Sequence, residues 1–370
     1  MIYKQFQDLQ LSRLGMGNMR LPVSRGKIDR QKARAIIGYA MEQGVNYYDT
    51  AYVYHSGESE SFLGEALSGY PRDSYYLGTK FYVMANPNIE QVFEEQLRKL
   101  RTDYIDFYLI HCVNEETIGA YMAQDRRYMD FLLEQKAKGR IRHIGFSSHG
   151  KPETLEKFLN WSDAFEFVQI QLNYLDWTMQ NAKRQYEIIT EYGLPVWVME
   201  PVRGGALASL TPDARSVLEQ AAPGKSAASW ALRYAASLPG VMTVLSGMSA
   251  MEQVEDNIAT FEAYQPLSEE ERAIVAGTAE KIRASVRIGC TGCEYCMPCP
   301  FGVNIPKNFA VWNEYGMYNN PGSVKWGLSN LKEGEFASAC QKCGACEPKC
   351  PQGLAIRDGL AAAAAELGAL

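Results

Sequence analysis

Residues 44–57 read GVNYYDTAYVYHSG, a short apolar run that ends in Asp49 and gives way to a polar turn. The segment before it, DRQKARAIIGYAMEQG at 29–44, carries apolar residues at helical spacing. A buried run that follows a helix and stops at a charged residue is one unit of an alternating pattern of helices and strands. We therefore expect a strand here, with Asp49 at its C-terminal end.

The same pattern recurs from the start of the chain to about residue 285. Eight runs read as strands: SRLGMGNM (12–19), VNYYDT (45–50), SYYLGTK (74–80), IDFYLIH (105–111), IRHIGFSS (141–148), FEFVQIQLN (165–173), LPVWVME (194–200) and VMTVLSG (241–247). Helical segments lie between them, for example 29–44, 88–100 and 126–139. Eight such units in roughly 250 residues favour an α/β fold of the (β/α)8 TIM-barrel type over an open doubly wound sheet. No GxGxxG follows the first strand, so the Rossmann fingerprint is absent.

A last helix is expected over SEEERAIVAGTAEKIRAS, 268–285, with Ser268 and Glu271 forming a capping box. Beyond it the composition changes abruptly, because cysteine, glycine and proline become frequent. We place a domain boundary there, with a barrel over 1–285 and a small second domain over 286–370.

The bulk properties restrict the class of protein. Hydrophobic residues make up 46% and charged residues 22% of the 370, which is typical of globular chains. A net charge of −6 without a basic run argues against nucleic acid and against an anionic membrane surface. The beginning, MIYKQFQDLQ, lacks a signal-peptide core. We expect a cytoplasmic protein, where clustered cysteines bind metal more often than they form disulfides.

Three of the expected strands end on or near a polar side chain, namely Asp49, Lys80 and His111, and Tyr54 follows in the loop after Asp49. The C-terminal ends of barrel strands meet at one rim, so these four side chains are a candidate proton-donor set. Asp49 and Lys80 follow apolar runs and are expected to pair. An ammonium close to Tyr54 is expected to lower the tyrosine's pKa, with His111 orienting a substrate carbonyl.

At this point the sequence resembles the aldo-keto reductase family, through GVNYYDTAYVYHSGESESFLGEAL, GTKF and YLIH. The resemblance covers residues 10 to about 262 and implies a barrel enzyme that reduces carbonyls with a nicotinamide cofactor. It carries the catalytic roles onto Asp49, Tyr54, Lys80 and His111. The alternative is that each residue is structural, as a buried ion pair, a core tyrosine and a satisfied histidine.

The resemblance also implies residues for the nicotinamide half of the cofactor. In GFSS, Ser147 matches the family's serine for the carboxamide, and Ser148 stands where the family has asparagine. Gln169 matches the amide-binding glutamine. Met199 stands where an aromatic ring usually stacks on the nicotinamide. This departure weakens the expected nicotinamide contact or leaves room for a different ring.

For the adenosine phosphates the resemblance implies LSGMSAMEQVEDN, with Gly247, Ser249, Gln253 and Asn257. Backbone N–H groups at a helix N-terminus favour anions. Ser249 stands where NADPH-dependent relatives carry an arginine for the 2′-phosphate. The choice between NADP(H) and NAD(H) therefore stays open.

Eight of the nine cysteines form two runs near the C-terminal end. Three closely spaced thiols and a fourth followed by proline match the two-cluster bacterial ferredoxin pattern, in which the fourth cysteine of each run binds the other cluster. We predict one [4Fe–4S] cluster on Cys290, Cys293, Cys296 and Cys350, and another on Cys340, Cys343, Cys346 and Cys299. The first run departs from this pattern, with two rather than three residues before Cys299. A zinc site is the alternative, but it would leave half of each run unused.

Between the runs, IPKNFAVWNEYGMY and SNLKEGEFASA read as helical, which predicts a small α-helical ferredoxin-like domain. The whole chain resembles aldo-keto reductases that carry such a domain. The expected function is reduction of a small aldehyde or ketone, with the clusters either transferring electrons or acting structurally. Hydride carries two electrons and a cubane one, so electron transfer requires a flavin or a redox partner such as a ferredoxin or flavoprotein. The alternative is an electron-transfer protein or redox sensor whose barrel is a binding platform.

Overall fold

The computed structural model describes residues 1–290 and 292–370, which form two compact units. The first comprises Met1–Ala208 and Lys225–Arg272, and the second Ser209–Gly224 and Ala273–Leu370. The expected domain boundary at residue 286 stays a prediction. No helix in the described part of the chain is both long and apolar enough to cross a membrane.

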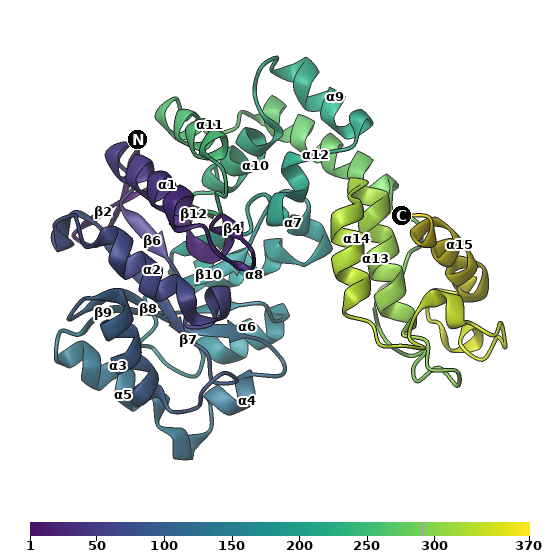
Figure 1. Cartoon of the computed structure of the whole chain (residues 1–370), viewed down its shortest axis with the longest axis horizontal. Helices are drawn as coiled ribbons and strands as arrows, with labels where there is room; N and C mark the ends of the chain where they lie inside the picture. Colours follow the sequence, from purple (N-terminus) through teal and green to yellow (C-terminus); the bar gives the residue numbers. More distant parts are fainter. Residues whose placement is uncertain (291) are drawn as a thin grey trace. The chain divides into compact units, whose positions relative to one another are not determined.

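The first unit is built on a closed barrel of eight parallel strands, which confirms the predicted fold (Figure 1). Around the barrel the strands follow the order β10-β11-β12-β3-β6-β7-β8-β9. Each of the eight predicted runs supplies one of them: β3 (Leu14–Gly17), β6 (Tyr47–Asp49), β7 (Tyr76–Phe81), β8 (Ile105–Val113), β9 (Ile141–Ser148), β10 (Phe167–Gln171), β11 (Val196–Met199) and β12 (Val241–Ser246).

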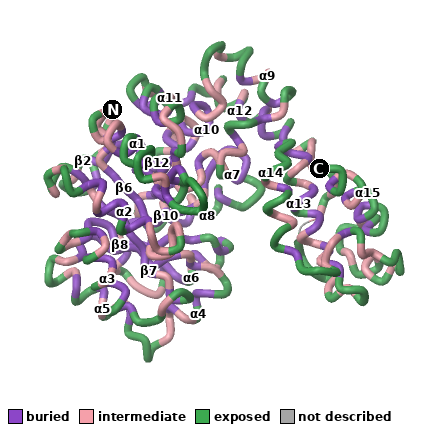
Figure 2. The backbone as a smooth tube through the Cα atoms, viewed as in Figure 1, coloured by how far each residue is buried: buried purple, intermediate pink, exposed green. Residues whose placement is uncertain are grey.

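Helices surround these strands, and their inner faces are buried while their outer faces are exposed (Figure 2). Their bounds are α1 (Arg30–Glu42), α2 (Glu58–Leu67), α3 (Ile89–Leu100), α4 (Ile118–Tyr121), α5 (Tyr128–Ala137), α6 (Pro152–Leu159), α7 (Asp176–Met179), α8 (Ala182–Glu191), α10 (Ala227–Ala236) and α11 (Met251–Glu262). Two short antiparallel pairs precede α1: β1 (Tyr3–Phe6) with β2 (Leu9–Ser12), and β4 (Val23–Ser24) with β5 (Lys27–Ile28).

Every second residue of a barrel strand points inward, and the interior cluster formed in this way is rich in aromatic rings. Tyr47, Phe107 and Phe167 belong to this interior cluster and are fully buried. Room for them comes from glycines: a Cβ on Gly145 would lie 2.5 Å from the Phe167 ring, and one on Gly78 would lie 2.6 Å from the Tyr47 hydroxyl. The next inward-pointing position along a strand, two residues after one of these interior residues, therefore lies closer to the C-terminal rim.

Helix α12 (Glu269–Ala284) runs from the first unit into the second. Its predicted capping box is present: the Ser268 N–H donates to Glu271 Oε2 at 3.0 Å, and the Glu271 N–H donates to Ser268 Oγ at 3.1 Å.

The second unit is helical and has its own hydrophobic cluster, which includes Phe309, Trp312 and Leu360. Its further helices are α9 (Pro212–Ala221), α13 (Ile305–Tyr318), α14 (Pro321–Ser329) and α15 (Ile356–Gly368). The helix expected over IPKNFAVWNEYGMY is α13, which confirms that prediction.

The prediction of a helix over SNLKEGEFASA, residues 329–339, is wrong. Helix α14 ends at Ser329, and only Ala337–Ala339 form a 3-10 turn in this stretch. Gly334 has φ +87°, a left-handed conformation that a helix cannot continue through. Helix α14 was not expected from the sequence; Asn320 caps its N-terminus and Pro321 takes the first turn.

Candidate active site and cluster-binding loops

The barrel brings the predicted catalytic side chains together through strand parity. Asp49 lies two residues after Tyr47 on β6, and Lys80 lies two residues after Gly78 on β7. His111 lies two residues after Leu109, another interior residue, on β8. Residues two apart share one face of a strand, so all three side chains point into the barrel near its C-terminal end.

Asp49 and Lys80 form the predicted ion pair. Lys80 Nζ lies 2.5 Å from Asp49 Oδ1 and also donates to the Thr50 carbonyl at 2.7 Å. Both side chains are buried, Lys80 completely. Burial alone would lower the pKa of Lys80, but Asp49 and Tyr54 outweigh it and raise that pKa above its ordinary value. The Lys80 amine is therefore held as an ammonium beside Tyr54, the residue predicted to be the proton donor.

Tyr54 is half-buried in the loop after β6, where a 3-10 turn spans Tyr54–Gly57. The following residues, His55 and Ser56, have φ of +50° and +55°, so the loop turns sharply. Lys80 Nζ lies 5.0 Å from the centre of the Tyr54 ring. The His111 ring packs edge-on against Tyr54, with the ring centres 5.8 Å apart.

The expected direction of the Tyr54 pKa is corrected by the structure. Burial raises the pKa of Tyr54 above 10.0, and the lowering effect of Lys80 does not overcome this. The charges of Asp49 and Glu200 raise it further. Tyr54 is therefore a protonated phenol at neutral pH, which suits a proton donor.

His111 is neutral in this environment. Burial lowers its pKa well below 6.5, and the positive charge of Lys80 adds to that effect. Its backbone carbonyl accepts a hydrogen bond from the Tyr121 hydroxyl at 2.6 Å. Within the described part of the chain its buried Nδ1 has no hydrogen-bond partner. A neutral imidazole can donate to a carbonyl oxygen through one nitrogen only, so the tautomer decides its role.

The residues expected at the carboxamide are neighbours across two strands. Ser147 on β9 is in register with Gln169 on β10, so both face the interior. The Cys112 N–H donates to Ser147 Oγ at 2.8 Å, which leaves the serine hydroxyl hydrogen free to donate. The buried Oε1 of Gln169 has no hydrogen-bond partner among the described residues, and its Nε2 donates to Met199 Sδ at 3.5 Å. A hydroxyl donor and an open amide acceptor side by side fit a carboxamide.

Ser148 lies beside this pair but is turned toward backbone. Its hydroxyl donates to the Val113 carbonyl at 3.4 Å and accepts from the Gly150 N–H at 3.3 Å. These local bonds position the loop after β9.

The residues expected at the adenosine phosphates lie after β12 and on α11. Ser249 is exposed, and its N–H donates to Gln253 Oε1 at 2.8 Å. Asn257 is only 4% exposed and donates to Ser246 Oγ at 3.0 Å, so it ties α11 to the end of β12. Gly247 is half-buried under the Arg20 side chain and Ser249 is exposed, and the phosphate roles stay predictions.

The two cysteine runs have the same backbone pattern. In the first run the second and fourth residues after the leading cysteine, Gly292 and Glu294, have φ of +69° and +64°. In the second run the equivalent Lys342 and Gly344 have φ of +53° and +79°. Each run ends in Cys-Pro-x-Gly with a left-handed glycine, Gly302 or Gly353, and leads into α13 or α15. The two cysteine loops and the helices that follow them thus repeat one loop-and-helix pattern.

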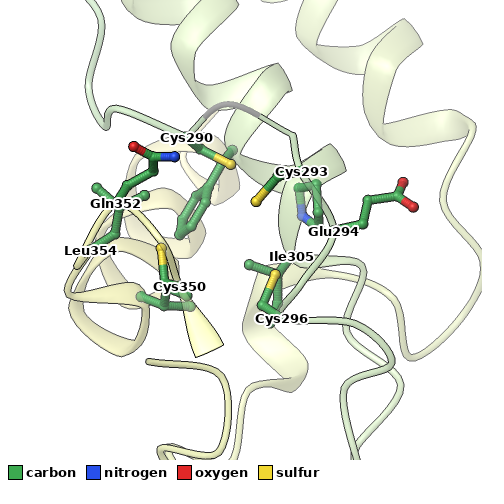
Figure 3. Close-up of a pocket in the computed structure, with 11 residues that line it drawn as sticks. Cys290, Cys293, Glu294, Cys296, Ile305, Cys350, Gln352 and Leu354 are labelled. Carbon is green, nitrogen blue, oxygen red and sulfur yellow. The ribbon is translucent and has the colours of Figure 1, made fainter. Parts of the chain in front are cut away.

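Four cysteines line one pocket, Cys290, Cys293 and Cys296 from the first run and Cys350 from the second. Figure 3 shows their sulfurs directed toward a common space, while the carboxylate of Glu294 points away from it. The other walls are largely apolar, with Ile305, Phe309, Pro306, Leu354 and Ile356. This is the set predicted from the crossed ferredoxin pattern, although its role as ligands stays a prediction.

The second set is partly brought together. Burial raises the pKa of Cys346, and the charge of Glu347 and the nearby thiols of Cys340 and Cys343 raise it further. Cys299 packs on the hydrophobic cluster of this unit, as do cysteines of both sets, so this contact does not assign it to either: Cys290, Cys296, Cys340, Cys346 and Cys350. Over residues 1–290 and 292–370, no three Cys, His, Asp or Glu side chains are grouped closely enough for one metal ion. The thiolates of a cubane bind separate irons.

Sequence reasoning missed two contributors to the active site. The Thr50 carbonyl accepts from Lys80, and the Glu200 carboxylate acts on Tyr54 from the end of β11. No motif pointed to either group. The Thr50 carbonyl belongs to the backbone, and the effect of Glu200 on Tyr54 arises only when the fold brings the ends of their strands close together.

A closed parallel barrel with an ion pair, a phenol and an imidazole gathered at the C-terminal ends of its strands defines a (β/α)8-barrel enzyme. Comparison with known proteins makes this specific. The chain belongs to the aldo/keto reductase family, whose family model matches residues 13–280. A 4Fe-4S dicluster domain matches residues 289–355. The chain is thus an oxidoreductase of the aldo/keto reductase type with an iron–sulfur domain.

Relatives cover the barrel part of the chain. The uncharacterized oxidoreductase YqkF of Bacillus subtilis is 26% identical over 313 residues, covering 74% of this chain and 95% of its own length. The NADH-specific methylglyoxal reductase of Escherichia coli is 26% identical over 307 residues, covering 68% and 90%. Among solved structures, the holo form of aldo-keto reductase AKR11C1 from Bacillus halodurans is 30% identical with a TM-score of 0.61, covering 75% of this chain and 96% of that one.

Proposed function

We propose that this chain reduces the carbonyl group of a small aldehyde or ketone with a reduced nicotinamide dinucleotide, and that Tyr54 is the general acid. The proposal rests on one observation, the convergence of four side chains from three adjacent strands. Lys80 contacts both Asp49 and the Tyr54 ring, and the His111 ring packs edge-on against the same tyrosine. Residues with unrelated structural roles would not be expected to converge in this arrangement.

When bound, reduced nicotinamide supplies a hydride to the carbonyl carbon. Tyr54 gives its phenolic proton to the carbonyl oxygen, so the products are an alcohol, the oxidised nucleotide and a phenolate. Lys80 stabilises that phenolate through its positive charge, and Asp49 holds Lys80 in place. The neutral imidazole of His111 orients the carbonyl oxygen by donating a hydrogen bond. A proton from solvent then restores Tyr54.

For the cofactor, Ser147 and Gln169 would hold the carboxamide, because they combine a free hydroxyl donor with an unpaired buried acceptor. Ser148 and Asn257 would support the adjoining loop and helix. Gly247, Ser249 and Gln253 would receive the adenosine phosphates at the start of α11.

We also propose that Cys290, Cys293, Cys296 and Cys350 hold one [4Fe–4S] cluster, and that Cys340, Cys343, Cys346 and Cys299 hold the other. The common pocket of the first set and the repeated backbone pattern support the crossed assignment. Bound clusters supply one-electron transfer, whereas the carbonyl step moves two electrons as hydride. The clusters would therefore exchange electrons with a flavin or with a ferredoxin or flavoprotein partner.

The test is an oxygen-free preparation in which iron, sulfide, flavin and nucleotide are measured on one sample, followed by turnover of an aldehyde panel with NADH and NADPH. We expect two four-iron clusters and nucleotide-dependent reduction. Turnover without any change in the cluster spectrum, and with no flavin, would limit the clusters to a structural role. No turnover together with rapid cluster reduction by a partner would favour the electron-transfer or sensor alternative, which is motivated by Met199 standing where an aromatic ring usually stacks on the nicotinamide.

A further inference from the structure

The two cysteine runs carry opposite charges at equivalent left-handed positions. These positions are the second and fourth residues after the leading cysteine. They hold Gly292 and Glu294 in the first run, and Lys342 and Gly344 in the second. Glycine adopts this conformation freely, whereas a residue with a Cβ is strained in it. Each run therefore keeps one charged residue at a position that glycine would fill without strain, an acid in the first run and a base in the second.

Both charged residues lie beside cysteines of their run and face the solvent. The Lys342 N–H donates to Cys340 Sγ at 3.4 Å, and Lys342 is exposed. Glu294 is exposed as well, and its carboxylate points away from the space that the first four thiols share (Figure 3). The two charges are thus open to a molecule that approaches either run from outside.

The remaining charges enlarge this difference between the runs. In the second run Lys349 is also exposed, and the carboxylate of Glu347 is bound by Arg357, with Nη2 2.7 Å and Nε 2.9 Å from Glu347 Oε2. In the described part of the chain neither Lys342 nor Lys349 has an ion-pair partner. In the first run, residues 290–300, Glu294 is the one charged residue of the sequence. The surface of the second run is therefore basic and that of the first run is acidic.

We infer that the second cysteine run is the docking site of an acidic flavoprotein electron carrier, with Lys342 and Lys349 as its basic contacts. This inference rests on the proposed function and deepens it, because it assigns the entry of electrons to one of the two clusters. One electron leaves the reduced flavin of the carrier, which becomes a flavin radical, and reduces the cluster proposed on Cys340, Cys343, Cys346 and Cys299.

Charge selects the second run over the first. Cys293 and Cys343 are both exposed, so access to the thiols does not distinguish the two runs. An acidic protein is attracted by Lys342 and repelled by Glu294, and complementary charges raise the rate at which proteins associate. A flavin accepts hydride as an electron pair and gives electrons singly, so a flavoprotein can link nicotinamide to a four-iron cluster.

The experiment mixes the full chain, prepared without oxygen, with a fully reduced acidic flavodoxin and follows the absorbance of the flavin radical at several salt concentrations. For the wild type we expect a rate that falls as salt rises, because salt screens the charges. Lys342→Gln with Lys349→Gln should lower the rate at low salt about tenfold and flatten its salt dependence. Lys281→Gln with Lys325→Gln is the matched control, because it removes two exposed lysines on α12 and α14, and the wild-type rate should be kept. Glu294→Gln should not lower the rate.

A reduced viologen, which is a small cation, checks that the clusters of each variant are intact. It should reduce the clusters of Lys342→Gln with Lys349→Gln at least as fast as those of the wild type. The inference is overturned if this double variant accepts electrons from flavodoxin at the wild-type rate, if the control pair lowers the rate as much, or if Glu294→Gln lowers it instead. Wild-type clusters that the viologen reduces and the flavodoxin does not would overturn the proposed electron exchange with a flavoprotein, and this inference with it.

Discussion

Lys80 Nζ lies 2.5 Å from Asp49 Oδ1 inside a barrel whose interior cluster is hydrophobic and rich in aromatic rings. Two charges in such surroundings stabilise the protein only as a pair, because each alone would be buried without compensation. The same pair places an ammonium against the Tyr54 ring. One contact therefore serves both folding and the proposed proton transfer.

Replacement of Tyr54 by Phe is expected to lower the rate of carbonyl reduction by about 10²- to 10⁴-fold while NADH binding is retained, since only the transferred proton is removed. Steady-state kinetics on an aldehyde panel measure this. Tyr52→Phe is the matched control, because Tyr52 donates to Glu95 on α3, and its turnover should stay at the wild-type level. Equal rates for wild type and Tyr54→Phe would refute the general-acid role.

The pH dependence follows from the raised pKa of Tyr54. Reduction requires the protonated phenol, so kcat/KM for reduction should stay flat through neutral pH and fall only above about pH 10. Oxidation of the alcohol requires the phenolate and should rise steadily from about pH 7 to about pH 10. Because the pKa of His111 lies well below 6.5, no acid limb is expected between about pH 6 and 7. A reduction limb centred near neutrality would contradict this assignment.

Replacement of Asp49 by Ala leaves the Lys80 ammonium buried without its carboxylate, and is expected to reduce the free energy of unfolding by about 3–5 kcal/mol. Urea denaturation followed by circular dichroism measures it. Lys138→Met provides the comparison, because Lys138 pairs with Glu134 on the exposed face of α5 and should cost at most about 1 kcal/mol. Similar losses of unfolding free energy in both variants would show that the buried Asp49–Lys80 pair contributes no more to stability than an exposed pair.

Paired cysteine substitutions test the crossed cluster assignment. Cys290→Ala with Cys350→Ala removes two ligands of one cluster, so iron per chain should fall by about half. Cys340→Ala with Cys350→Ala removes one ligand from each cluster and should reduce iron further. The reverse order would show that each run binds its own cluster. Cys112→Ser should keep full iron, since Cys112 lies at the barrel rim beside Ser147.

Much of the fold was predictable because strand parity and helical spacing are local properties. The eight strands, the helices α1, α3, α5 and α13 and the capping box at Ser268 all follow from nearby residues. The helix predicted over 329–339 does not form, because Gly334 takes a left-handed conformation. The composition of this stretch does not reveal that conformation. Helix α14 was missed although Asn320 and Pro321 mark its start.

By itself, the sequence determined the parallel barrel, the strand ends that carry Asp49, Lys80 and His111, and the presence of two equivalent cysteine runs. Only the tertiary structure decided which of these groups meet. It brought Cys350 to the thiols of the first run and raised the pKa of Tyr54 where its neighbours alone predicted a fall. The physical reason is that spacing along a chain fixes the direction of a side chain, whereas desolvation and long-range contact depend on what the rest of the fold packs around it.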